Sequence, residues 1–184
     1  MHSRVFKGFL FREDEDIRKK LKEEEARYFI EENHEDYLYE IMQHIGADYV
    51  SRNLSNLEGD IDWLISSTLE ETDEKKVKRI IDKIRQDFDG VDIYVIKGKH
   101  YNMLKKGLNK DIDKRIEKIK MLLENIKPKN KVYTMYSIKE AAYPSYDFAF
   151  LIYQYGFLNN TLELFNEMQK NSVLVIVDSY DYHF

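Results

Sequence analysis

The run from Val173 to Val177 (Val-Leu-Val-Ile-Val) constrains the fold most, because five consecutive aliphatic residues predict a buried strand. Other strand patterns are interleaved with helical ones along the chain. A helix is predicted over residues 73–88, because Val77, Ile81 and Ile84 would lie on one side of it. The interleaving indicates an α+β (mixed α/β) protein, in which a central mixed sheet of about five strands is flanked by helices.

The remaining elements follow from the same two periodicities. Strands are expected at 4–11, 91–97 and 131–138, and helices at 34–45, 101–106, 112–126 and 160–168. Two segments stay open. Residues 60–67 fit either a strand or a helix, and the apolar run 146–155 fits either a buried strand or a short buried helix.

Length and composition limit the classes of protein to which the chain can belong. A chain of 184 residues is expected to form one domain over 1–184, with a weak composition shift near 131 between a charged part (1–131) and an aromatic-rich part (132–184). The absence of cysteine excludes disulfides, cysteine-based zinc sites and thiol nucleophiles. No apolar run approaches the roughly 18 residues of a membrane span. The short, interrupted N-terminal segment does not resemble a signal peptide, so a cytoplasmic protein without a membrane partner is expected.

Charge is distributed unevenly along the chain, whose formal net charge is −5. Residues 13–36 hold eleven acidic and five basic side chains, for a net charge of −6. Residues 97–131 hold twelve basic and four acidic side chains, for a net charge of +8. The basic segment, which carries Lys110, Lys114 and Lys118 at four-residue spacing, could attract an anionic molecule.

Three aspartates form a candidate metal site. On a strand, alternation places Asp60 and Asp62 on the same face, and Asp92 lies in the next expected strand. Magnesium prefers oxygen ligands and usually takes one or two protein carboxylates together with phosphate oxygens. Three converging carboxylates would therefore predict a Mg²⁺ site able to clamp a triphosphate and activate a hydroxyl.

The order of these motifs resembles that of the minimal nucleotidyltransferases over residues 34–97. That family has a helix, a Gly-Ser turn, an Asp-x-Asp strand and a third aspartate on a later strand. In this chain Ser51-Arg52 precedes Asp60 at about the family's distance, and Val50 stands where the family has glycine.

The resemblance implies a nucleotidyltransferase-like protein, which is either an active enzyme or a degenerate one. Under it Asp60, Asp62 and Asp92 would bind Mg²⁺, and Asp92 would assist as a metal ligand or base. Ser51 and Arg52 would contact a nucleoside triphosphate.

A different hypothesis starts from the tyrosines. Fourteen tyrosines in an acidic chain without a phosphate-binding glycine loop are typical of a non-enzymatic binding module, such as an immunity protein or antitoxin that blocks a basic protein partner. Most aromatic residues after residue 131 are expected in the core, and some of the tyrosines, together with the acidic Asp178 and Asp181, could form the surface that meets this partner. A third possibility is a homodimer that uses the tyrosine-rich face as its own interface.

Overall fold

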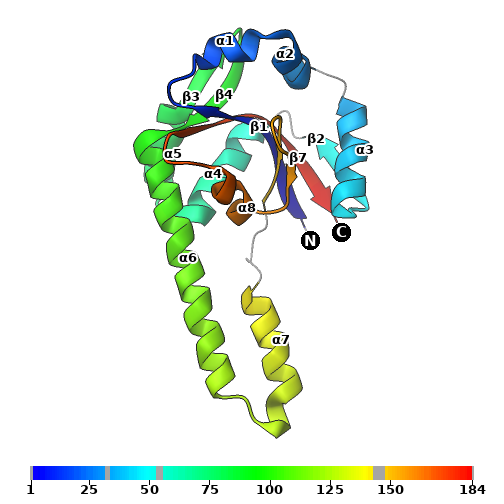
Figure 1. Ribbon diagram of the computed structural model, residues 1–184, viewed down its shortest axis with the longest axis vertical. Helices are drawn as coiled ribbons and strands as arrows, with labels where there is room; N and C mark the ends of the chain where they lie inside the picture. Colours follow the sequence, from blue (N-terminus) through cyan, green and yellow to red (C-terminus); the bar gives the residue numbers. More distant parts are fainter. Residues whose placement is uncertain (1, 32–33, 53–55, 143–147, 184) are drawn as a thin grey trace.

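The computed structural model describes residues 2–31, 34–52, 56–142 and 148–183. Within these residues, a mixed sheet of seven strands is flanked by helices on both faces, which confirms the α+β fold (Figure 1). The strands are β1 (His2–Arg12), β2 (Tyr49–Arg52), β3 (Arg85–Phe88), β4 (Val91–Ile96), β5 (Ala149–Ile152), β6 (Gly156–Leu158) and β7 (Ser172–His183). The helices are α1 (Ile17–Lys22), α2 (Glu24–Glu31), α3 (His34–Ile45), α4 (Leu57–Leu69), α5 (Glu74–Ile84), α6 (Gly98–Glu124), α7 (Lys131–Ala142) and α8 (Thr161–Glu167), and the 3-10 helix η2 is Pro128–Asn130.

The two longest strands form the centre of the sheet. The strand order is β3-β4-β7-β1-β5-β6, and β2 pairs with the C-terminal half of β7. β1 and β7 are antiparallel along their whole length, whereas β1 and β5 are parallel. The aliphatic run in β7 thus lies at the middle of the sheet, as expected of a strand that is buried on both faces.

Side chains of the central strands alternate between two apolar cores. Val5, Phe9 and Phe11 of β1 lie in the core covered by α1, α2 and α3. Phe6 of β1 lies in the opposite core, which is covered by α4, α5, α6 and α8. Gly8 lies at a bulge against β7, where an added Cβ would come within 2.2 Å of the Val175 carbonyl oxygen. The period-2 pattern of the strand residues therefore produces a three-layer arrangement.

Three expectations about secondary structure need correction. Residues 60–67 form part of helix α4, so the strand that would align Asp60 with Asp62 is not present. Residues 131–138 lie in helix α7, which packs against α6; Thr134 is 5% exposed, while its neighbours Tyr133 and Met135 are exposed. The helix expected over 73–88 ends at Ile84, and the chain continues as β3. Apart from these segments, the sheet has seven strands rather than about five, because β2, β3 and β6 are too short to give a clear sequence pattern.

A helical hairpin projects from this α/β body (Figure 1). The hairpin comprises α6, η2 and α7 and is called the arm (Gly98–Ala142) below; the other described residues form the body. The two helices expected at 101–106 and 112–126 are one continuous helix, α6. Gly107 sits at its contact with α4, where an added Cβ would come within 2.4 Å of the Thr68 carbonyl oxygen. None of the helices in the described part of the chain has the length and apolar composition needed to cross a membrane.

Candidate functional site

The three predicted metal ligands lie on two elements and point in different directions. Asp60 and Asp62 are two residues apart on α4, so about 200° of rotation around the helix axis separates them at 3.6 residues per turn, and their side chains lie on nearly opposite sides. Asp60 is 2% exposed, whereas Asp62 is half-buried. Asp92 lies on β4 and is exposed. Among the described residues, which include all three aspartates, no group of three or more carboxylate or histidine side chains is placed to hold a metal ion.

Asp60 is engaged in a buried polar network that joins α4 to the sheet. Its Oδ1 accepts a hydrogen bond from Arg4 Nε at 2.7 Å, and its Oδ2 accepts one from Ser179 Oγ at 2.6 Å. Arg4 also forms an ion pair with Asp181 and lies 5.2 Å from the centre of the Trp63 ring. A buried carboxylate that is compensated in this way holds the first turn of α4 on the sheet, which is a structural role.

Asp92 lies beside cations rather than beside the other aspartates. Its Oδ2 is 4.0 Å from Arg85 Nε, and Arg85 also pairs with Glu58 in the first turn of α4. Lys78 donates a hydrogen bond to Glu58, and this bond, with a smaller contribution from Arg85, lowers the pKa of the Glu58 carboxyl despite its partial desolvation. This cluster is a set of internal ion pairs at the helix N-terminus, where negative side chains are favourable.

The positions expected to bind a triphosphate lie on a strand. Ser51 and Arg52 belong to β2, where Ser51 is opposite Asp181 and Arg52 is opposite Tyr180; the Arg52 side chain lies outside the described residues. Val50 is 5% exposed in the core, so the backbone here forms sheet hydrogen bonds rather than a loop whose amides could approach phosphate. The geometry therefore brings Ser51 near the Arg4–Asp181 pair, without forming the family's phosphate turn.

The end of β7 contributes little to the surface expected for a basic partner. Tyr180 and Tyr182 are 0% and 4% exposed, and Asp178 is buried with them on β7. They lie inside because β7 continues to His183 between β1 and β2. Asp178 is therefore not accessible to a partner, whereas Tyr133, Tyr136, Tyr153 and Tyr155 of the same aromatic-rich part are exposed.

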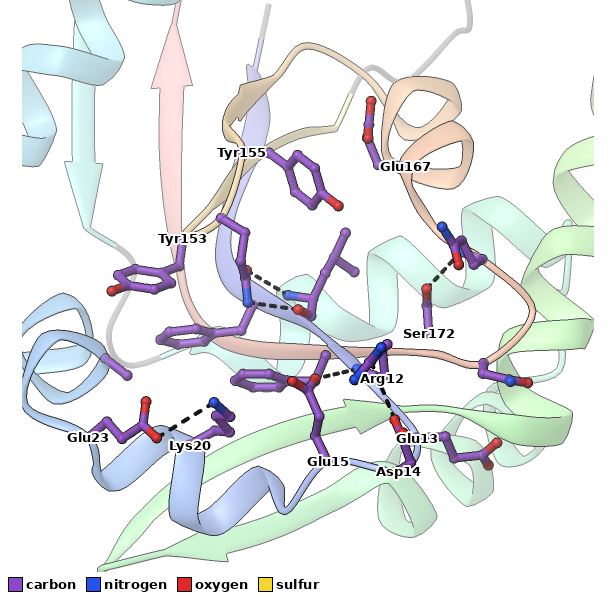
Figure 2. Close-up of a pocket in the computed structure, with 17 residues that line it drawn as sticks. Arg12, Glu13, Asp14, Glu15, Lys20, Glu23, Tyr153, Tyr155, Glu167 and Ser172 are labelled. Carbon is purple, nitrogen blue, oxygen red and sulfur yellow. Dashed lines mark hydrogen bonds and ion pairs between the residues drawn. The ribbon is translucent and has the colours of Figure 1, made fainter.

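A different site lies at the other end of β1. An open groove of about 940 Å³, called the acidic groove below, lies between the β1–α1 turn, the β5–β6 turn and the segment from α8 to β7 (Figure 2). Its lining residues are Phe9–Glu15, Lys20, Glu23, Ala26, Tyr153–Tyr155, Glu167, Gln169, Asn171 and Ser172. The groove exists because β1 extends to Arg12, whereas its parallel neighbour β5 pairs only as far as Gly8.

The strand edge exposed by this difference in length is already capped. Gln154 acts as a short substitute for a strand, since the Leu10 N–H donates to its Oε1 at 3.0 Å and its Nε2 donates to the Leu10 carbonyl at 2.7 Å. The Arg12 N–H donates to Glu15 Oε2 at 2.7 Å, and the Glu15 N–H donates back to the Arg12 carbonyl at 3.0 Å. An incoming peptide therefore meets side chains rather than a free edge that it could extend by β-pairing.

The side chains around the groove make it acidic. Five carboxylates line it, against two cations, for a net charge of −3: Glu13, Asp14, Glu15, Glu23 and Glu167 against Arg12 and Lys20. Arg12 is 3.5 Å from Asp14, and Lys20 is 3.6 Å from Glu23. Within the described part of the chain, Glu13 and Glu167 form no ion pair. Figure 2 shows Glu167 and Tyr155 across the groove from Glu13 and Asp14.

Tyrosine contributes the apolar component of the site. Tyr155 is 50% exposed, and Tyr153 packs 5.4 Å from the Phe9 ring while its hydroxyl donates to Glu25 Oε2 at 2.8 Å. This hydrogen bond to Glu25, together with desolvation, raises the pKa of the Tyr153 hydroxyl. The groove thus combines uncompensated carboxylates with an amphipathic aromatic wall, which suits a ligand that carries both positive charge and apolar surface.

Sequence reasoning found the acidic segment but not the groove. The excess of acid over 13–36 is visible in the sequence, and it supplies four of the five lining carboxylates. Glu167 and the two tyrosines come from segments more than a hundred residues away, and the pairing of β1 with β5 and with β7 brings them to the acidic segment. No family model, curated protein or solved structure matches this chain, so its function has to be argued from this geometry.

Proposed function

We propose that the protein is a non-catalytic binding module that takes a basic segment of a protein partner in its acidic groove. The observation that supports this proposal is that Glu13, Glu167 and Tyr155 line one open groove. Neither glutamate has a cation partner in the described residues. A lysine or arginine between these carboxylates would be attracted by both, and its aliphatic stem would pack on tyrosine.

An immunity protein or an antitoxin is a binding module of this kind. It would block its partner by placing carboxylates against a basic active site, and charge complementarity would speed the encounter. The arrangement of carboxylates supports binding better than nucleotidyl transfer, since Asp60 is neutralised by Arg4 and Asp92 lies beside Arg85. Nucleotidyl transfer stays a prediction that needs its own assay.

Peptide titration tests the proposed function. A fluorescent peptide of alternating lysine and tyrosine should bind, and its Kd should rise when the salt concentration goes from about 0.05 M to about 0.5 M, because charges at the rim of the groove are screened. The double variant Glu13→Gln/Glu167→Gln should weaken binding by about tenfold, as expected of two partly exposed charge pairs.

Two controls make the titration specific. Glu40→Gln removes an exposed carboxylate of α3, away from the groove, and should leave Kd unchanged. A peptide with glutamate in place of lysine should not bind. Equal weakening by Glu40→Gln and by the groove variant would reject the groove as the binding site.

A further inference from the structure

The arm exposes apolar side chains on the face of α7 that points away from α6. Val132, Tyr133 and Tyr136 are 81%, 78% and 68% exposed, and Met135 lies beside them. At about 100° per residue these side chains fall on one side of α7, and the inward-facing Thr134 and Ala141 on the other. The first two turns of α7 thus expose aromatic and aliphatic side chains on the uncovered side, and the charged Lys139 and Glu140 follow on the same side near the end of the helix.

Such a face is unusual for a surface helix. A surface helix normally turns its apolar stripe toward the core, whereas here large apolar side chains lie on the exposed side of α7. At about 200 Å² per tyrosine side chain, Tyr133 and Tyr136 alone expose on the order of 300 Å², which approaches the largest apolar patch of a typical monomer. The face therefore has the properties of an interaction surface.

Charge decides what kind of surface can cover the arm. The segment 97–131 carries a net charge of +8, and Lys127, Lys129 and Lys131 lie at the tip, next to the first turn of α7. Two arms packed against each other would juxtapose like charges and repel. The occupant must therefore be acidic and must also offer apolar or aromatic contacts.

The chain itself carries such a surface in the acidic groove. The groove has a net charge of −3 and exposes Tyr155 beside its carboxylates. Helices α1 and α2, which border the groove, lie at the end of the molecule away from the tip of the arm (Figure 1). The 27 residues of α6 span about 40 Å, so the tip cannot reach the groove of its own chain in this conformation.

We propose that the arm of one copy docks in the acidic groove of a second copy. The proposal deepens the proposed function and rests on it, since the basic segment that the groove takes is then the arm of a like chain. Two copies lying antiparallel can each place the arm in the groove of the other, and this reciprocal contact closes as a two-fold dimer. Tyr133 and Tyr136 then meet Tyr155, and the lysines of the tip meet Glu13 and Glu167.

A charge swap tests the proposal on the full chain. The arm variant is Lys127→Glu/Lys131→Glu, and the groove variant is Glu13→Lys/Glu167→Lys; all four residues are exposed. In sedimentation velocity at low salt, the unmodified protein should have twice the 22.2 kDa mass of the chain. Each variant alone should sediment as a monomer, and an equimolar mixture of the two should regain the dimer, because both contacts are again complementary.

A control variant and the results that would overturn the proposal complete the test. Glu40→Lys, on α3, should dimerise like the unmodified protein. A monomer at every salt concentration, or a mixture of the two variants that stays monomeric, would overturn the arm-in-groove contact. If the peptide binds but the protein does not dimerise, the arm-in-groove contact is rejected and the proposed function stands. If the peptide does not bind and the protein does not dimerise, both proposals are rejected. If both hold, the lysine–tyrosine peptide should dissociate the dimer by competing for the groove.

Discussion

The body and the arm place their apolar side chains in opposite ways. In the body, Phe6, Phe148 and Phe150 are fully buried and pack against one another with ring centres 5.6 to 5.7 Å apart. In the arm, Val132 and Tyr133 are about four-fifths exposed although they lie on a regular helix. Burial of apolar area stabilises the body, whereas the same area on the arm contributes nothing until another surface covers it.

The two regions also treat charge differently. In the body, carboxylates at the start of α4 are paired with Arg4, Lys78 and Arg85. In the arm, lysines crowd the tip without comparable acidic neighbours in the sequence. Burial and ion pairing therefore stabilise the body, and the recognition that we propose uses two exposed surfaces, the arm and the acidic groove of the body.

The largest expected effect is on the free energy of unfolding, when a buried and an exposed aromatic residue are each replaced by alanine. Phe150→Ala should lower the free energy of unfolding by about 4 kcal/mol, because it removes buried area and leaves a cavity. Tyr133→Ala should change it by less than about 0.5 kcal/mol. Urea unfolding of the two variants measures both values. Similar losses would show that the arm is part of the stabilising core.

The next effect compares the two aspartates of α4. Asp60→Asn should cost about 3 kcal/mol, because Arg4 would lose a buried partner. Asp62→Asn, on the half-buried side of the same helix, should cost less than about 0.5 kcal/mol. Chemical denaturation with both variants tests this, and equal costs would contradict the structural role of Asp60.

A smaller effect depends on pH. The pKa of Glu58 is lowered in the folded state, chiefly by the hydrogen bond from Lys78, so its stabilising contribution is present above the ordinary value of 4.5 and is lost as pH falls through the lowered pKa. Glu58→Gln should reduce stability at neutral pH by about 0.5 kcal/mol, since the pairs are partly exposed and screened. The difference should shrink as the pH falls below 4.5; a difference that grows in acid would contradict the sign.

The smallest expected effect is that of metal and nucleotide. Adding Mg²⁺ with a nucleoside triphosphate should leave the melting temperature unchanged, because the three aspartates do not converge. Binding at a hundred times Kd would instead stabilise the fold by about 2.7 kcal/mol. A rise in melting temperature that Asp62→Asn abolishes would favour the nucleotidyltransferase hypothesis over the binding module.

The elements with strong periodicity could be predicted from the sequence. The β7 core, β1, α3 and β4 follow from apolar runs or amphipathic spacing, as does the helix expected from Asn160, which forms as α8. The segment 131–138 resembles a strand because Val132, Thr134 and Tyr136 alternate, yet it forms a helix that packs against α6 and buries Thr134. Packing against a neighbour overrode the local β propensity.

The candidate site could be predicted less well than the fold. Asp60 resembles a metal ligand in sequence because its partners, Arg4 and Ser179, are 56 and 119 residues away. The acidic groove depends on where β5 stops pairing with β1, a register that no local pattern encodes. The charge segregation between 13–36 and 97–131 was the sequence signal that came nearest to the two proposed surfaces.

The central claim is that the acidic groove recognises basic segments, and a map of peptide contacts tests it most directly. In heteronuclear NMR of the labelled protein, addition of the lysine–tyrosine peptide should shift the amide signals of Phe11–Glu15, Tyr153–Tyr155 and Glu167–Ser172, the segments that line the groove. Those of β2 and β4 should stay unchanged. Shifts centred on Asp62 and Asp92, or no shifts at all, would contradict the account.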